Sequence, residues 1–101
     1  MDLKMVKQAM ELKNKMDKVQ KELGKMTVEA ESGNGAVKVK ANGQQKVLSI
    51  TISPEVVNPA KVKDLEKLVL KAVEDALEKS RKLASDEMKQ LTGGMNFPGL
   101  T

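Results

Sequence analysis

The 101 residues are 32% charged, and 18 lysines and arginines against 14 aspartates and glutamates give a formal net charge of +4. Histidine, cysteine, tryptophan and tyrosine are absent and Phe97 is the only aromatic residue, which excludes an imidazole base, a thiol nucleophile and a Cys/His metal site. The longest aliphatic run is Leu68-Val69-Leu70, whereas a membrane span needs about 20 residues, and charges interrupt every apolar run at the start, unlike a signal peptide. We therefore expect one cytoplasmic domain over residues 1–101, not an enzyme, with no cofactor, metal, small-molecule substrate or membrane partner.

The first segment has the apolar spacing of a helix. Apolar residues step by four and three in alternation from Met5 to Met26, which defines a continuous seam on one helix face. Asp2 is a suitable N-cap and Gly24 a suitable stop, so a helix is predicted over residues 3–24. The face opposite the seam has two interpretations, a cation surface for a partner or an ordinary solvated face. It carries a lysine stripe made of Lys4, Lys7, Lys18, Lys21 and Lys25, which Glu11 and Asn14 interrupt.

After this helix the apolar period shortens to two, which is typical of strands. Apolar and polar residues alternate over 28–31, 37–41 and 48–53. The separators at 33–35 (Gly-Asn-Gly) and 42–43 (Asn-Gly) supply residues that tolerate positive φ, as tight hairpin turns require. A phosphate cradle is the other interpretation of a glycine-rich turn, but the first separator lies between two strands and opens no helix. The pattern therefore predicts an antiparallel three-stranded meander with one apolar face.

A second, longer helix follows the strands. Asn58-Pro59 gives an N-cap and a first-turn proline, and apolar residues recur from Val62 to Leu91. The helix is predicted over 60–91, and residues 93–101, which have no period, are expected to form a flexible tail. The predicted fold class is α+β, an α-β-β-β-α subunit with the meander between two long helices.

The predicted lengths indicate a homodimer. At 1.5 Å per residue the helices are about 33 Å and about 48 Å long, whereas a seven-residue strand covers about 23 Å and three strands make a sheet about 14 Å wide. Both helices overhang such a sheet, its two edges stay open, and it cannot cover both apolar stripes. A second copy that joins the sheets and pairs the helices would resolve these mismatches.

Three stretches of the chain, taken together and in this order, resemble a known family. They are Gly33–Val39 continuing to Asn42-Gly43, Val47–Ile52 continuing into Pro54–Val57, and Leu91–Met95 ending in Pro98-Gly99. The family is the YbaB/EbfC family of bacterial nucleoid-associated DNA-binding proteins, and the resemblance spans essentially the whole chain. It implies a tweezer-shaped homodimer whose paired helices project as arms, a nucleoid location, and a role in binding duplex DNA and organising the chromosome.

The family motifs lie on turns, sheet and tail, so candidate DNA contacts must be inferred from charge. Binding to the duplex backbone needs cations spaced along a surface, each replacing condensed counterions. A single arginine is unfavourable for base reading, and missing aromatics are unfavourable for single-strand stacking, so we expect low sequence selectivity. The basic residues late in the second helix are weaker candidates, because the helix dipole alone favours cations there. The candidates are Lys4, Lys7, Lys13, Lys15, Lys18, Lys21, Lys25, Lys79, Arg81, Lys82 and Lys89.

A prefoldin-like chaperone or coiled-coil scaffold is the alternative function. Met5, Met10, Met16 and Met26 suit adaptable apolar contacts. Against this alternative, Lys79 falls where a seam residue of the second helix belongs, and three strands exceed a single hairpin. Salt separates the two functions, since DNA binding weakens steeply with salt and apolar holding of clients does not.

Overall fold

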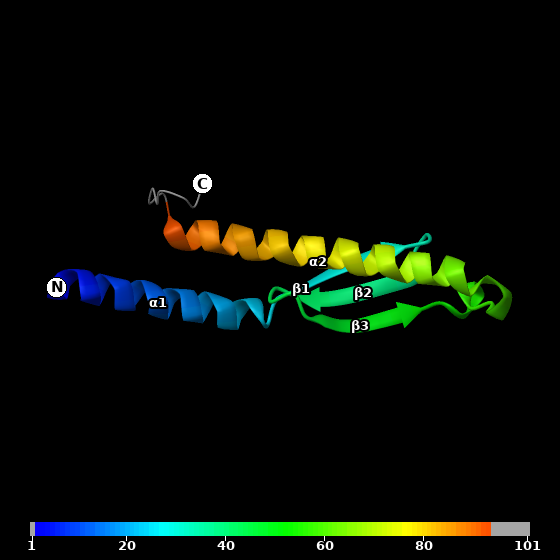
Figure 1. The fold of residues 1–101 in the computed structure, drawn as a ribbon, viewed down its shortest axis with the longest axis horizontal. Coiled ribbons are helices and arrows are strands. Elements are labelled where there is room, and N and C mark those ends of the chain that lie inside the picture. The colour runs from blue at the N-terminus through cyan, green and yellow to red at the C-terminus, as the bar shows by residue number, and fades with distance from the viewer. Residues whose placement is uncertain (1, 94–101) are drawn as a thin grey trace.

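The computed structural model describes residues 2–93 and confirms the predicted α+β class and the α-β-β-β-α order (Figure 1). Element boundaries differ from the predicted ones by one or two residues. Within residues 2–93, no helix has the length and apolar character needed to cross a membrane. The predicted flexible tail lies, from residue 94 onward, outside the described residues. The elements are α1 (Leu3–Leu23), β1 (Thr27–Ser32), β2 (Val37–Asn42), β3 (Val47–Ile52), the 3-10 turns η1 (Pro54–Val56) and η2 (Pro59–Lys61), and α2 (Val62–Thr92).

The three strands form one antiparallel sheet in the order β1-β2-β3. Ala30 pairs with Val39, and Val37 pairs with Ile52, so the apolar side chains of all three strands share one face, as paired residues do. The β1–β2 turn has positive φ at each residue of 33–35, which explains its Gly-Asn-Gly sequence.

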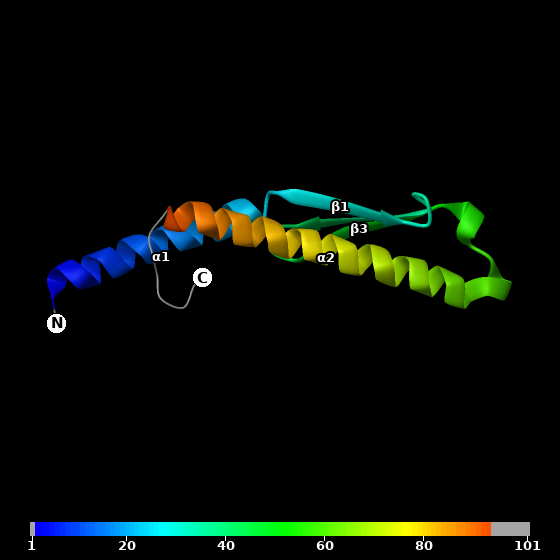
Figure 2. The ribbon, with the colours of Figure 1, turned by 90° about the horizontal axis from the view of Figure 1, so that it is seen from above.

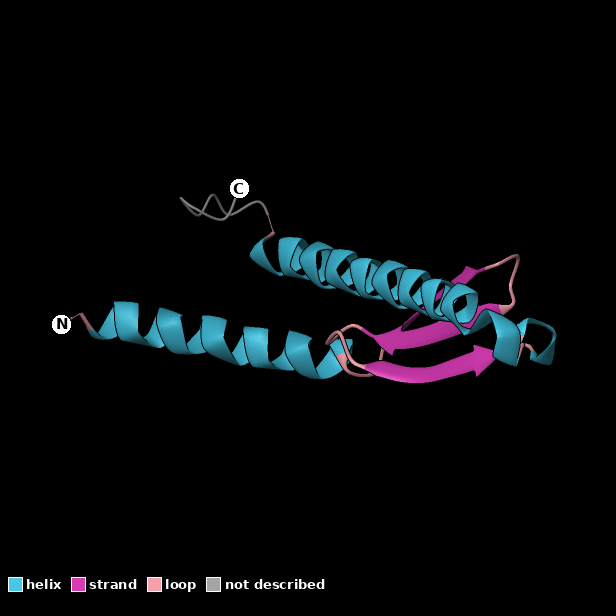
Figure 3. Ribbon diagram, turned by 45° about the vertical axis from the view of Figure 1, so that its right-hand side comes forward, coloured by secondary structure: helices cyan, strands magenta, loops and turns pink. Residues whose placement is uncertain are grey.

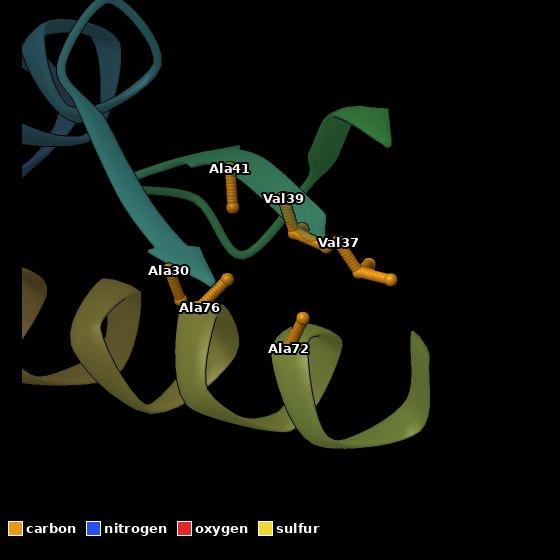
Figure 4. Packing of buried hydrophobic residues seen from close by; sticks show 6 residues of the cluster. All are labelled: Ala30, Val37, Val39, Ala41, Ala72 and Ala76. Atoms are coloured by element: carbon orange, nitrogen blue, oxygen red, sulfur yellow. The ribbon is translucent and has the colours of Figure 1, made fainter. Parts of the chain in front are cut away.

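Helix α2 packs against the apolar face of the sheet. Ala72 and Ala76 lie one turn apart on α2 and are fully buried against the sheet (Figure 4). Small side chains at these positions let the helix backbone approach the strands closely. The resulting core is thin, because it holds only alanines and valines, and burial of apolar area scales with side-chain size. Its members are Ala30, Val37, Val39, Ala41, Ala72 and Ala76.

The apolar face of β3 is left open. Ile50 and Ile52 point to the same side as the buried Val39 and Val37, yet they are 45% and 38% exposed. The reason is that α2 packs chiefly on β1 and β2. One chain therefore cannot cover all the apolar surface of its own sheet.

The two helices project beyond the sheet at the same end (Figures 1 and 3). Helix α1 lies beyond the sheet and beside the C-terminal part of α2, and the whole molecule measures 67 × 23 × 19 Å. We call α1 and residues 81–92 of α2 the arms. On α1 only Leu23 is fully buried, with Leu12 and Val19 half-buried, so the apolar seam of α1 stays largely exposed in a single chain.

Two local predictions were wrong in detail. Gly43 does not have positive φ; the left-handed residue of the β2–β3 turn is Gln45, at φ 64°. Asn58 caps η2 rather than α2, because its side chain accepts a hydrogen bond from the Ala60 amide at 3.0 Å. The α-helix then begins at Val62.

Candidate nucleic-acid interface

The lysine stripe lies along one exposed face of α1. Asp2 caps the helix by accepting a hydrogen bond from the Lys4 amide at 3.0 Å, and the regular helix that follows holds the lysines at fixed spacing. All five lysines of the stripe are exposed, with Lys25 just beyond the C-cap Gly24. From Lys4 to Lys25 the stripe extends about 32 Å, which is close to one turn of duplex DNA, about 34 Å.

The stripe lysines form no ion pairs with the described residues, so they are available to an external anion. Among residues 2–93 the salt bridges involve Lys13, Lys40 and Lys71 and none of the five stripe lysines. Lys13 Nζ lies 3.8 Å from Asp17 Oδ2, so a carboxylate already offsets part of its charge. Lys13 is therefore a weaker phosphate ligand than the stripe, whereas Lys15 is exposed and outside these pairs.

Most of the candidate basic residues of α2 differ from the stripe, because they lie near carboxylates or are bonded to the sheet. Lys79 Nζ donates a hydrogen bond to the Glu29 carbonyl oxygen at 2.7 Å, which fastens α2 to the edge strand β1. Arg81 and Lys82 share an open hollow with Glu31, Asp75 and Glu78, so cations and carboxylates alternate there. Lys89 is exposed in the last turn of α2. The structure thus keeps the five stripe lysines on one exposed face of α1, whereas Arg81 and Lys82 of α2 share their surface with carboxylates. Lys79 has a structural role that sequence reasoning missed.

Two apolar surfaces also escaped the sequence reasoning. Leu3, Val6 and Met10 form a second exposed strip on α1, away from the seam, with Leu3 84% and Met10 61% exposed; their spacing of three and four residues could have revealed it. The other surface is a hollow of about 440 Å³ between β3 and the start of α2. It is lined by Ile52, Val62, Leu65, Glu66, Val69, Leu70 and Val73.

No group of three or more side chains suited to holding a metal ion occurs among residues 2–93. The hollows on the described surface include a polar one on the sheet face, lined by Glu29, Lys40, Ser49 and Thr51 among others. There Lys40 Nζ lies 3.6 Å from Glu29 Oε1, so opposite charges are balanced within the sheet.

An elongated α-β-β-β-α chain with lysine-bearing helical arms is typical of a protein that binds another macromolecule. The chain belongs to the YbaB/EbfC DNA-binding family, whose model matches residues 2–95. That family is a DNA-binding family and not an enzyme family.

Curated relatives agree with this assignment, and a solved structure shares the fold. A "Nucleoid-associated protein" of Desulforamulus reducens is 50% identical over 97 residues, covering 96% of this chain and 92% of the relative. A nucleoid-associated protein of Caldanaerobacter subterraneus is 47% identical over 96 residues, covering 95% and 86%. The crystal structure of an uncharacterized protein from Helicobacter pylori matches with a TM-score of 0.79 at 15% identity, covering 92% of this chain and 99% of that one. The last match shows the shared fold.

Proposed function

We propose that this protein is a nucleoid-associated protein that binds duplex DNA mainly through its backbone phosphates, with low sequence selectivity, and helps to organise the chromosome or affects gene expression. The observation that carries the proposal is the lysine stripe, five exposed cations without a carboxylate partner among residues 2–93, on a member of a DNA-binding family. Its location in this proposal is the cytoplasmic nucleoid, where the DNA lies. The relatives are named nucleoid-associated proteins, which supports that location.

Lysine chemistry favours phosphate over base contacts. The ammonium group is a flexible point charge without the fixed fork of a guanidinium, and phosphate contacts fix position without carrying sequence information. Arg81 is the only arginine of the chain and lies in the mixed-charge hollow of α2. A surface of this kind recognises the charge of the DNA backbone and much less the base sequence.

The functional unit in this proposal is a homodimer shaped like tweezers, in which the arms of each chain project from a joined body. The open edge of β3 supports it, since unpaired strand edges favour pairing with another chain. The exposed Ile52 of β3 and Leu70 of α2 line the 440 Å³ hollow, whose single charged lining residue is Glu66. Ile50, two residues before Ile52 on the same strand, is also exposed. A second copy across this edge would cover that apolar surface and place two lysine stripes on one particle.

Binding of a fluorescent duplex of about 30 base pairs, titrated at several salt concentrations, tests the proposal. The logarithm of the binding constant should fall linearly with the logarithm of salt, because each neutralised phosphate releases about 0.9 counterion. Absence of binding at low salt, or binding that salt leaves unchanged, would overturn it.

A prefoldin-like chaperone or coiled-coil scaffold is the second candidate, and one observation favours it. Leu3, Met5 and Met10 expose a large apolar area at the tip of α1, which suits an unfolded client. Suppression of client aggregation that persists at high salt, with no duplex binding at low salt, would select this candidate instead.

A further inference from the structure

The turn between β2 and β3 contacts α1 at the point where that helix ends. The Gly43 amide donates a hydrogen bond to the Leu23 carbonyl oxygen at 2.9 Å. The Asn42 side-chain amide donates to the Gly24 carbonyl oxygen at 3.4 Å, and the Gln44 side-chain amide donates to the Gln20 carbonyl oxygen at 2.6 Å. These bonds join the turn to carbonyl groups at the C-terminal end of α1, two of which also accept a local backbone amide, Gln20 from Gly24 and Leu23 from Met26, both at 3.2 Å.

The same turn is fastened to α2 through one buried hydroxyl. Ser80 Oγ donates to the Asn42 carbonyl oxygen at 2.7 Å and accepts a hydrogen bond from the Gln45 amide at 3.0 Å. Ser80 is fully buried, so water does not compete for these bonds. Residues 81–92, the arm of α2, follow Ser80 directly along the helix.

The turn itself is held rigid. Asn42 Oδ1 accepts hydrogen bonds from the amides of Gln44 at 2.9 Å and Lys46 at 3.1 Å. Gln45, between these two residues, adopts the left-handed conformation, and its own amide is bonded to Ser80 Oγ. A Cβ on Gly43 would lie 2.8 Å from the Leu23 side chain, so the turn and the end of α1 are already in close contact.

The rest of α1 has little other support within one chain. Every residue of 3–11 is exposed, so packing between the helices fixes the direction of α1 only weakly. Because α1 is about 32 Å long, a tilt of about 10° at its end moves the tip by about 6 Å. Consecutive phosphates on one DNA strand rise by about 3.4 Å, so such a tilt displaces the lysine stripe from its phosphates.

We infer that the β2–β3 turn is the joint that sets the angle between the two arms, and that Asn42, Gln44 and Ser80 are positioning residues for DNA binding. This inference rests on the proposed function. None of the three residues belongs to the lysine stripe. They act through the lysines, by holding the two arms in one relative direction.

Ser80→Ala and Gln44→Ala test this joint from its two sides. The first removes the hydroxyl that fastens the turn to α2, and the second removes an exposed side chain that fastens the turn to α1. Ser32→Ala is the matched control, because Ser32 Oγ donates to the Leu68 carbonyl oxygen at 2.6 Å and is likewise buried. Ser32 ties α2 to β1 and touches neither the turn nor α1.

The arm angle is measured by spin labels on cysteines. The chain has no cysteine of its own, so Met10→Cys on α1 and Gln90→Cys on α2, both exposed positions outside the lysine stripe, give one distance per chain. Mixing with excess unlabelled protein leaves at most one labelled chain in each dimer. Otherwise unmodified protein should give a narrow distance distribution, and Ser32→Ala should keep it.

Ser80→Ala and Gln44→Ala should broaden or shift this distribution by several ångströms and raise the Kd for duplex DNA about tenfold. Ser32→Ala removes one hydrogen bond where Ser80→Ala removes two, so it should also lower Tm, by less, while changing the Kd less than about twofold. Distributions and Kd values that match the control would overturn the inference. An altered angle with unchanged Kd would overturn the positioning role. Absence of DNA binding by the unmodified protein would overturn the proposed function. In that case the measured distances alone would still decide whether the turn sets the angle between the arms.

Discussion

Gly43 lies so close to Leu23 that a Cβ built on it would be 2.8 Å from both the Cδ2 and the carbonyl oxygen of Leu23. The Gly43 amide donates to that same carbonyl oxygen, so the close approach is part of the bond between turn and helix. Glycine is present here for space and not for conformation, since its φ is not positive.

Gly43→Ala should therefore lower the free energy of unfolding by about 1–3 kcal/mol, the usual effect of forcing extra atoms into a packed site. Urea denaturation followed by circular dichroism measures it. Gly24→Ala is the control, because its new Cβ would meet the end of the flexible Gln44 side chain instead. Equal effects of the two substitutions would contradict this explanation.

We expect a homodimer, because the apolar surface beside β3 is uncovered in one chain. Light scattering should report about twice the chain mass of 11.0 kDa, in keeping with a closed two-fold pair. Ile52→Asp together with Leu70→Asp should give monomers, because both residues are exposed and line the open hollow. Leu3→Asp, a change of the same kind at the tip of α1, should leave the dimer intact; monomers from this control alone would place the interface on α1.

Single lysine substitutions should separate phosphate ligands from structural lysines. Lys18→Ala should lower the salt slope of DNA binding by about 0.9, or by about twice that if both copies contact one duplex. Lys79→Ala should instead lower the free energy of unfolding, by about 0.5–1.5 kcal/mol for one lost hydrogen bond, because Lys79 is bonded to Glu29. Salt titrations and thermal melts of both variants check this division, and the reverse assignment of effects would refute it.

Selectivity among duplexes should be low. Competition between unrelated duplexes of equal length should change the apparent affinity less than about tenfold, about 1.4 kcal/mol, because lysine contacts to phosphates carry no base information. A thousandfold preference would mean that base edges or DNA shape are recognised.

Periodicity predicted α1, α2 and the three strands because apolar residues recur on one face of each and turn-forming residues bound them. The seam of α1 and the alternation of β2 are local patterns, which neighbouring residues express directly. Exposure of the lysine stripe followed from the same helical period. The structure confirms that these lysines are exposed, and their binding to DNA stays a prediction.

The rest depended on contacts between residues distant in sequence. Ser80 meets Asn42 across 38 positions and Lys79 meets Glu29 across 50, and no local pattern encodes such pairs. Sequence reasoning placed Lys79 among the DNA ligands because charge was visible and its bond to β1 was not. It explained the Asn42-Gly43 separator by tolerance of positive φ, because the close approach of Leu23 to Gly43 arises only once α1 has packed against the turn.

The central claim, that the lysine stripe of α1 binds DNA phosphates, is tested most directly by one binding titration. Lys7, Lys18 and Lys21 are changed together to Glu. The control changes Lys61, Lys63 and Lys67 together to Glu, an exposed set at the end of η2 and the start of α2 with the same change of charge. Circular dichroism verifies that both variants fold.

The stripe variant should lose detectable binding at a salt concentration where the unmodified protein binds, because six reversed charges per dimer repel the phosphates. The control should lose less than about tenfold, about 1.4 kcal/mol. The account would be contradicted by a folded stripe variant that binds as tightly as the unmodified protein, or by a control that loses as much binding as the stripe variant.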